Sequence, residues 1–275
     1  YEKGGDGAVR ECRAPLVGLR DGSFKSDLPT AELAFYYNVS YFVVSQVNPH
    51  IAPFFFYSQG SAGRGVGRWA DDEAWLNIGN AARRRVSELW GLLGRTGTPQ
   101  ENLNILEWGP GGGANAYGLK DICSKFYGVD ISEKNLIEAG RVLGAETVPG
   151  FFHPVLLAGD PASVTASIPP EIDIFFSTAV FQHFPSREYG REVLESIRNV
   201  CRDSAAGFIQ IRFDNGIEKY KGIQGIEDYR ARHIFANSYP LDVFWDLTMS
   251  AGFRPLYINA IRKANNYATF YLSAT

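Results

Sequence analysis

The pattern of apolar positions between residues 71 and 94 predicts one amphipathic helix. Apolar side chains recur there at three- and four-residue steps, which places them in one stripe along a helix. Asp71 and Asp72 suit the amino-terminal end of this helix, and Gly94 suits its carboxyl end. The stripe consists of Trp75, Ile78, Ala82, Val86, Leu89 and Leu93.

Beyond this helix, short apolar runs alternate with segments that have room for a helix. Each run is short enough to be a buried strand, and Ser132 suits the amino-terminal cap of the helix that follows the second run. This alternation predicts βαβ units and therefore a mainly parallel sheet covered on both faces. The runs are residues 104–107, 126–130, 154–158, 172–176 and 207–213.

The end of the chain departs from this alternation. Residues 253–261 and 267–273 are rich in strand-forming side chains, and only residues 262–266 separate them. Because so few residues cannot hold a crossover helix, the two runs are predicted to form an antiparallel hairpin.

Composition and charge narrow the classes of protein and partner. Of the 275 residues, 45% are hydrophobic and the net charge is −3, so a large core is available and no basic face is expected to attract nucleic acid. No run of about 18 apolar residues is present, which predicts that nothing spans a membrane. The three cysteines form no CxxC pair, and no cluster of His, Cys and carboxylates has metal-ligand spacing. We expect no metal and a cytoplasmic protein.

A glycine-rich turn follows the first predicted strand. The segment from Glu107 to Gly113 holds four glycines, which let the backbone turn sharply and approach a ligand that a Cβ atom would repel. Asp130 ends the next strand, at the separation where an acidic side chain reaches ribose hydroxyls in a doubly wound sheet. Together these features predict a nucleotide site.

From about residue 69 to the end, the chain resembles class I SAM-dependent methyltransferases. The resemblance rests on "ILEWGPGGGANA", "GVDIS", "AGD" and "DIFFSTAVFQHF". It implies a methyltransferase domain over residues 69–275, built on a doubly wound, mainly parallel seven-stranded sheet with a carboxyl-terminal antiparallel hairpin. It also implies S-adenosylmethionine as cofactor. The cofactor-binding residues it implies are Glu107, Gly109, Gly111, Gly113, Asp130, Ile131, Asp160, Ser177 and Thr178.

Alternatives stay open at two points of this interpretation. The turn from Gly109 also fits the GxGxxA form of a nicotinamide fingerprint, and a non-catalytic SAM- or nucleotide-binding module is a further possibility. Glu107 ahead of the turn and the terminal hairpin favour the methyltransferase. Asp160 is expected at the adenine amino group, but because Pro161 follows it, Asp160 is equally suited to cap the next helix.

We expect methyl transfer to a small-molecule acceptor, at oxygen or nitrogen. His183 lies just beyond the fourth strand, where ligands of open α/β sheets bind, so it is the candidate catalytic base. The alternative is a histidine hydrogen-bonded within its loop. The predicted helix from Asp71 and residues 214–239, with Tyr220, Tyr229, Arg230, Arg232 and His233, are expected to wall the acceptor pocket.

The first 68 residues are unrelated to the rest. Residues 16–64 resemble the carboxyl-terminal part of patatin-like triacylglycerol lipases, and Asp21-Gly22 matches the aspartate motif of that family. No GxSxG serine elbow is present, so we expect an inactive remnant that forms a short α/β fragment, with a helix and a strand over residues 33–45. Residues 60–67 read as a flexible glycine-rich linker. Because the chain opens at Tyr1, we interpret it as an excerpt from something longer.

Overall fold

The computed structural model describes residues 2–3, 9–10, 64, 71–95, 97, 99, 102–145, 147–157, 159–222, 237–262 and 266–275. The chain divides into two compact units, Tyr1–Ser58 and Gln59–Thr275. Within the first unit, β1 (Glu2–Lys3) and β2 (Val9–Arg10) pair antiparallel. The predicted boundary at residue 68, the linker over residues 60–67, except for Arg64, and the elements of residues 33–45 lie outside the described residues and stay predictions.

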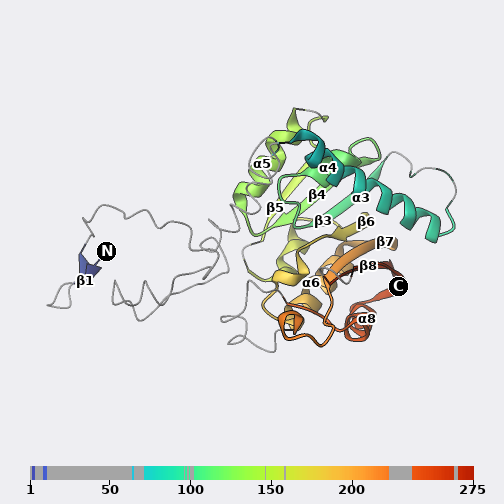
Figure 1. Cartoon of the computed structure of the whole chain (residues 1–275). Coiled ribbons are helices and arrows are strands. Elements are labelled where there is room, and N and C mark those ends of the chain that lie inside the picture. Colours follow the sequence, from blue (N-terminus) through green and yellow to red (C-terminus); the bar gives the residue numbers. More distant parts are fainter. Residues whose placement is uncertain are drawn as a thin grey trace. The chain divides into compact units, whose positions relative to one another are not determined.

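A seven-stranded sheet forms the centre of the second unit (Figure 1). Its strand order is β5-β4-β3-β6-β7-β9-β8. The first five strands of the sheet are parallel, and β9 joins β7 and β8 antiparallel, so the predicted mainly parallel sheet with a terminal hairpin is confirmed. The strands are β3 (Leu103–Trp108), β4 (Cys123–Asp130), β5 (Phe152–Leu156), β6 (Ile172–Ser177), β7 (Cys201–Arg212), β8 (Phe253–Arg262) and β9 (Tyr267–Ala274).

The chain reverses direction across the sheet between β3 and β6. It starts at β3, moves outward through β4 to β5, and then crosses back to β6 on the other side of β3. In open α/β sheets, the connections that leave such a switch point diverge to opposite faces and leave a crevice at the carboxyl ends of the strands. The glycine-rich turn leaves the end of β3, so the fold places it at this crevice.

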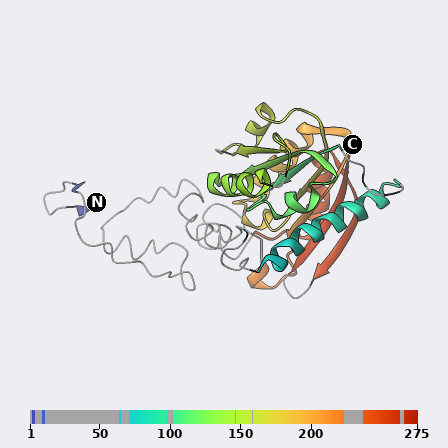
Figure 2. The same ribbon diagram turned by 90° about the horizontal axis from the view of Figure 1, so that it is seen from above.

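Helices cover both faces of the sheet, as the alternation along the sequence predicted. Successive strand residues point into different core clusters: Ile105 packs with the α3 side and Leu106 with the α6 side. One layer contains α3 (Asp72–Leu92), α4 (Ala114–Leu119) and α5 (Glu133–Gly144). The other contains the 3-10 helix η3 (Pro161–Ala166), α6 (Arg187–Val200) and α8 (Leu241–Ser250). Figure 2 shows α3 lying along its face of the sheet.

Side-chain caps fix where the main helices begin. Asp71 accepts a hydrogen bond from the backbone N–H of Glu73, and Ser132 accepts one from Asn135. Gly94, which follows α3, has a φ of 68°, a left-handed conformation that glycine adopts without strain. The predicted start and end of this helix and the Ser132 cap are confirmed.

Three strands begin two or more residues before their predicted starts. β5 was expected at residues 154–158 but begins at Phe152, because it pairs in register with β4 from Phe126 onward. β4 begins at Cys123 and β7 at Cys201, each earlier than expected. After a buried cysteine, each of these two strands continues with polar residues that are exposed or half-buried. The apolar pattern of the sequence marks only the buried part of a strand.

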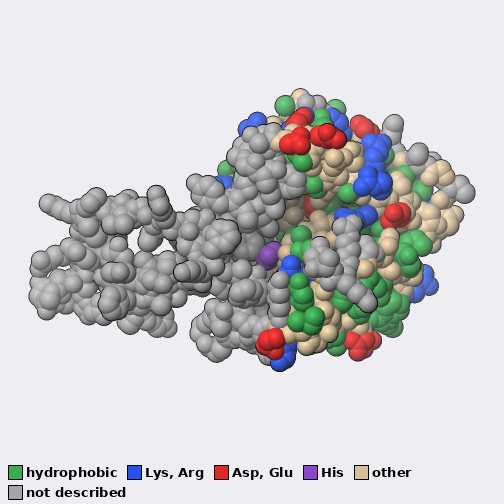
Figure 3. Space-filling view, viewed as in Figure 1, with side chains coloured by type: hydrophobic (Ala, Val, Ile, Leu, Met, Phe, Trp, Pro, Cys, Tyr) green, Lys and Arg blue, Asp and Glu red, His purple; other side chains and the backbone are tan. Residues whose placement is uncertain are grey.

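The described surface mixes charges of both signs. On the face shown in Figure 3, acidic and basic side chains are interspersed. Among the described residues, no helix combines the length and the apolar character that crossing a membrane requires.

A glycine contact between α3 and α4 yields a stability prediction. A Cβ atom added to Gly118 would lie 2.4 Å from Gly79 backbone atoms, which cannot move aside easily. Overpacking of this kind costs roughly 1–3 kcal/mol, so Gly118→Ala should lower the free energy of unfolding by about that amount. At Gly140 on α5 the nearest atom would be 3.9 Å away, so Gly140→Ala should raise stability, by up to about 1 kcal/mol. Urea denaturation of both variants checks this, and equal stabilities would contradict the contact.

Candidate functional site

The glycine-rich turn brings bare backbone to the crevice. Gly109, Gly111 and Gly113 have φ values of 83°, 53° and 84°, which favour glycine. A Cβ atom on Gly109 would also lie 2.3 Å from a methyl group of Val180, in the loop that follows β6. The turn therefore needs glycine for its conformation and for its close approach to the β6 loop.

Glu107 carries its carboxylate at the end of β3, deep beneath this turn. Only 1% of the residue is exposed. One carboxylate oxygen, Oε1, accepts a hydrogen bond from Asn115 Nδ2 at 2.5 Å, whereas the buried Oε2 has no hydrogen-bond partner. Burial raises the pKa of Glu107 to about 8, although the Asn115 hydrogen bond opposes the shift, and the nearby charge of Asp130 adds to it. An orphaned acceptor of this kind points to a ligand group outside the protein.

Asp130 ends β4, the strand next to β3. Its Oδ1 accepts from the Ser132 backbone N–H at 2.8 Å and its Oδ2 from Asn135 Nδ2 at 3.2 Å. Burial raises the pKa of Asp130 to about 6, and these hydrogen bonds limit the shift. Hydrogen bonds from the backbone N–H groups of Gly111 and Ile131 also lower the pKa of Asp130, so the glycine-rich turn and the end of β4 meet at this carboxylate.

Ser177 and Thr178 lie where β6 meets the crevice. The hydroxyl of Ser177 donates to the Trp108 carbonyl at 2.8 Å, which ties the ends of β6 and β3 together, and Ser177 is fully buried. Ala179 follows with a φ of 59°, an unusual left-handed conformation for a residue with a side chain. Such strain is frequent at functional sites.

Asp160 caps the 3-10 helix η3. Its Oδ1 accepts from the Ala162 backbone N–H at 2.8 Å, and its side chain is exposed. The capping interpretation of Asp160 is therefore realised, and the adenine contact stays a prediction. Ile131, which follows Asp130, is 54% exposed, and so an apolar surface lies beside the carboxylate.

His183 closes the 3-10 turn η4 (Phe181–His183) after β6. Its Nε2 lies 3.2 Å from the side-chain Nε2 of Gln182, so a contact within the loop is present. Burial lowers the pKa of His183 to about 3, and the Arg212 cation adds to the effect. The imidazole is thus neutral at physiological pH. Because a group that binds protons so weakly is a poor base, this low pKa weighs against the role of catalytic base for His183.

Two asparagines of the site were missed from the sequence. Asn115 and Asn135 are buried at the starts of α4 and α5, and each donates to one of the two carboxylates. In both cases the sequence offered the same signal. An asparagine lies in the first turn of the helix that follows a strand with an acidic residue at or near its end.

The predicted acceptor wall is only partly within the described residues. Tyr220 lies at the end of η5 (Glu218–Tyr220), where the Arg212 guanidinium lies 5.6 Å from the centre of its ring. Tyr229, Arg230, Arg232 and His233 lie outside the described residues. In the part of the chain that the structure describes, no three His, Cys, Asp or Glu side chains are grouped so that they could hold a metal ion.

Comparison with known proteins finds a family model that matches part of the chain. Residues 106–209 match the family described as "Methyltransferase domain". Magnesium protoporphyrin IX methyltransferase from Synechocystis, with bound SAH, has a TM-score of 0.54 at 15% identity and is covered over its whole length by 83% of this chain. The cyclase SpnF has a TM-score of 0.53 at 10% identity, over 71% of this chain and 81% of its own. These likenesses establish the fold, and SpnF indicates that the fold alone does not fix the reaction.

A second similarity covers 47 residues. Over that length the chain is 57% identical to a patatin-like phospholipase domain-containing protein of Meyerozyma guilliermondii and 55% identical to one of Candida albicans. The segment is 17% of this chain but only 7% and 6% of those proteins. The patatin-like resemblance is confirmed, while Asp21 and the rest of the motif lie outside the described residues.

The buried histidine yields a prediction for stability. In the unfolded chain the pKa of an imidazole is about 6.5. In the folded protein burial lowers the pKa of His183 to about 3. Between these values the unfolded state binds a proton that the folded state does not. The free energy of unfolding should therefore fall as pH falls through this window, by at most about 1.4 kcal/mol per pH unit. His183→Gln should reduce the slope in urea denaturation, and an identical slope in both proteins would contradict the burial of a neutral imidazole.

Proposed function

We propose that the domain of this chain whose residues 106–209 match the methyltransferase family model transfers a methyl group from S-adenosylmethionine to a small-molecule acceptor, at oxygen or nitrogen. The observation that carries the choice of cofactor is the buried Glu107 carboxyl group beneath the glycine-rich turn, with one oxygen lacking a partner. The bare backbone of the turn and the two buried acidic side chains fit a ligand that approaches closely and carries positive charge.

The charge of the site favours a cationic ligand. Glu107 and Asp130 are both buried, and each would be negative when ionised. S-adenosylmethionine carries an ammonium group and a sulfonium, so it offsets the cost of ionising these carboxylates. A nicotinamide dinucleotide carries an anionic pyrophosphate instead, which would oppose the ionisation of Glu107 and offer no positive charge to either carboxyl group. This comparison supports S-adenosylmethionine over the nicotinamide alternative.

Each group of the site has a place in this proposal. Glu107 lies beneath the methionine portion, and Asp130 accepts from both ribose hydroxyls. The exposed apolar surface of Ile131 offers a packing surface for the base. The bare backbone of the turn lets the cofactor approach closely. The other residues assigned to the cofactor are Gly109, Gly111, Gly113, Asp160, Ser177 and Thr178.

The bound cofactor supplies an activated methyl group, and the protein's task is to position the acceptor. An in-line displacement requires the acceptor atom, the methyl carbon and the sulfur to be aligned, and such alignment provides much of the rate enhancement. The turn of Phe181–His183 lies beyond the strand end where an acceptor would stand. Because His183 is neutral and weakly basic, we assign it to shaping this wall rather than to taking the acceptor's proton.

Substitution of Asp130 tests the cofactor assignment. Asp130→Ala removes the acceptor for the two ribose hydroxyls, and the loss of a charged hydrogen-bond partner costs about 1.5–3 kcal/mol, or roughly ten- to a hundredfold in affinity. The affinity of the parent should also fall as pH drops below about 6, since protonated Asp130 accepts less well. Calorimetric titration with S-adenosylmethionine measures both effects. As the matched control, Asp203→Ala removes an exposed aspartate from the β7 strand and should bind like the parent.

Substitution of Asp160 distinguishes a capping role from a cofactor-binding role. If it only caps η3, then Asp160→Ala should lower thermal stability slightly and leave cofactor affinity unchanged. If it also meets the adenine amino group, the affinity should fall. Parent-like affinity in Asp130→Ala would contradict the proposed site as a whole.

The function itself is tested by transfer of a labelled methyl group. The chain is incubated with tritium-labelled S-adenosylmethionine and a panel of small hydroxylated and amine acceptors. Tritium in the acceptor is counted, and S-adenosylhomocysteine is quantified by mass spectrometry. We expect an acceptor-dependent signal that Asp130→Ala lacks. Cofactor binding with no acceptor-dependent transfer across the panel would favour a non-catalytic binding module.

Once the preceding assay has identified an acceptor, the role of His183 can be measured. His183→Ala should reduce kcat by less than the roughly hundredfold that removal of a general base causes. The rate of the parent should not fall through the usual histidine range near pH 6.5, because this imidazole is already neutral there. A drop of about a hundredfold, with cofactor affinity and melting temperature unchanged, would instead make His183 the base.

A further inference from the structure

The protein holds the two buried carboxylates of the crevice to different degrees. Hydrogen bonds from four groups act on Asp130, and three of these groups are backbone N–H groups. Among the described residues, Glu107 has a single donor, the side-chain amide of Asn115, whose Nδ2 lies 2.5 Å from Glu107 Oε1. The position of the Glu107 carboxylate therefore depends on one side chain.

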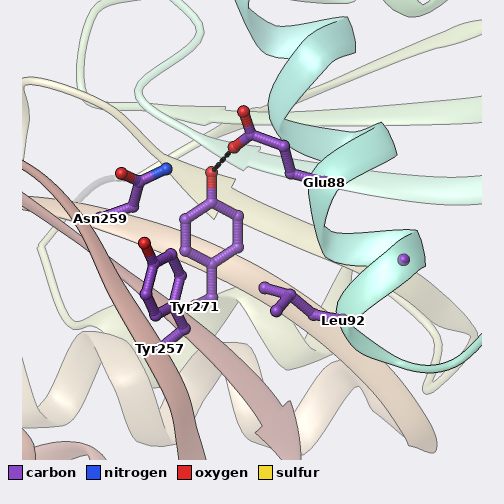
Figure 4. A pocket seen from close by; sticks show the side chains of 6 residues that line it. Glu88, Leu92, Tyr257, Asn259 and Tyr271 are labelled. Atoms are coloured by element: carbon purple, nitrogen blue, oxygen red, sulfur yellow. Dashed lines mark hydrogen bonds between the residues drawn. The ribbon is translucent and has the colours of Figure 1, made fainter.

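A carboxylate with a single donor points to a ligand only where it is buried. Glu88 also has one, the hydroxyl of Tyr271 at 2.6 Å, beside a cavity between α3 and the terminal hairpin (Figure 4). Because Glu88 is exposed, water can satisfy its remaining lone pairs. Glu107 is 1% exposed, and its buried Oε2 has no partner. Of these two acids, Glu107 is the one that needs a ligand group to complete its hydrogen bonding.

Asn115 is presented to Glu107 by a part of the fold that has little room to move. It lies in the first turn of α4, which begins directly after the glycine-rich turn, and only 7% of the residue is exposed. A Cβ atom on Gly79 of α3 would lie 2.5 Å from the Ala114 carbonyl oxygen, so the start of α4 packs closely on α3. The Asn115 amide can therefore fix the orientation of the carboxylate that it holds.

The chemistry of the asparagine matters as much as its position. An amide donates a hydrogen bond but carries no charge, so it holds a carboxylate without neutralising it. Among the ion pairs between described residues, none involves Glu107. The charged group that acts on the pKa of Glu107 is Asp130, which is itself acidic. One oxygen of Glu107 is thus fixed, and the charge of the carboxylate is left for a bound cation to balance.

We propose that Asn115 is a positioning residue for the amino-acid portion of the cofactor: by holding Glu107 Oε1, it directs Oε2 toward the ammonium group of the cofactor. The proposal rests on the proposed function, because it takes S-adenosylmethionine as the ligand. Asn135, which donates to Asp130, belongs instead to the ribose portion. Loss of the Asn115 amide should therefore weaken ligands that carry the ammonium group and spare ligands that lack it.

Two stable compounds separate these portions of the cofactor. S-adenosylhomocysteine keeps the amino-acid portion with its ammonium group, whereas 5′-methylthioadenosine keeps the adenosine and the sulfur but lacks that portion. Both are titrated calorimetrically into the parent and into Asn115→Ala. We expect the variant to bind S-adenosylhomocysteine about tenfold more weakly than the parent, and to bind 5′-methylthioadenosine within about twofold of the parent.

Two further variants are the matched controls. Asn135→Ala removes the corresponding amide at the other carboxylate, and it should weaken both compounds by the same factor because both contain the ribose. Tyr271→Phe removes the single donor of Glu88, outside the site, and should bind both compounds like the parent. The melting temperature of each variant is measured beside its affinities, so that a loss of folded protein is not mistaken for a loss of binding.

The pH dependence of binding gives a readout that a purely structural role would not change. Burial raises the pKa of Glu107 to about 8, and the Asn115 hydrogen bond opposes this shift. Without that bond the pKa rises further, so on lowering the pH the affinity of Asn115→Ala for S-adenosylhomocysteine should begin to fall at a higher pH than that of the parent. Asn115→Ser, whose side chain is shorter, should show the same displacement and serves as a second variant.

The outcomes distinguish this role from the choice of cofactor. An equal loss for the two compounds in Asn115→Ala, no loss for either, or an unchanged pH dependence would overturn the positioning role and leave the cofactor assignment intact. If the parent binds neither compound, the cofactor assignment fails and the positioning role fails with it.

Discussion

Burying a carboxylate costs free energy, and this fold buries two at the ends of adjacent parallel strands. Glu107 and Asp130 are each less than a tenth exposed, and burial raises the pKa of both. The fold pays part of this cost with hydrogen bonds from Asn115 and Asn135, yet one oxygen of Glu107 is left without a partner. A structure that tolerates this arrangement is explained most simply by a cationic ligand that completes it.

The arrangement of the sheet follows from the same requirement. Strand order reverses beside β3, so the crevice opens where Glu107 ends its strand and Asp130 ends the neighbouring one. The glycine-rich turn can fold over Glu107 only because Gly109 has no Cβ atom to meet Val180. Ser177 then fixes the end of β6 to the end of β3 through the Trp108 carbonyl. The glycine-rich turn and the two buried acidic side chains therefore lie at one edge of the sheet.

The sequence predicted the architecture well because its signals are local. The α3 stripe, the Ser132 cap and the apolar strand runs each report on residues close together in the chain. Each marks an element that the structure contains, although three strands begin earlier than predicted. Which polar side chains face the site was less accessible, since Asn115 and Asn135 act through the way their helices pack on the sheet. The low pKa of His183 also depends on tertiary burial. The hydrogen bond from Tyr271 to Glu88 joins a strand to a helix 183 residues away in the sequence, so no local pattern predicts it.

The most direct test of the account is proton release when S-adenosylmethionine binds. Without a ligand, Glu107, with a pKa of about 8, is largely protonated at neutral pH, and binding of a cationic ligand should drive it to ionise. Calorimetric titration at neutral pH in two buffers of different ionisation enthalpy measures the protons exchanged. The account predicts net proton release by the parent, with weaker binding and no comparable release by Glu107→Gln. Equal affinity and equal proton exchange in the two proteins would contradict it.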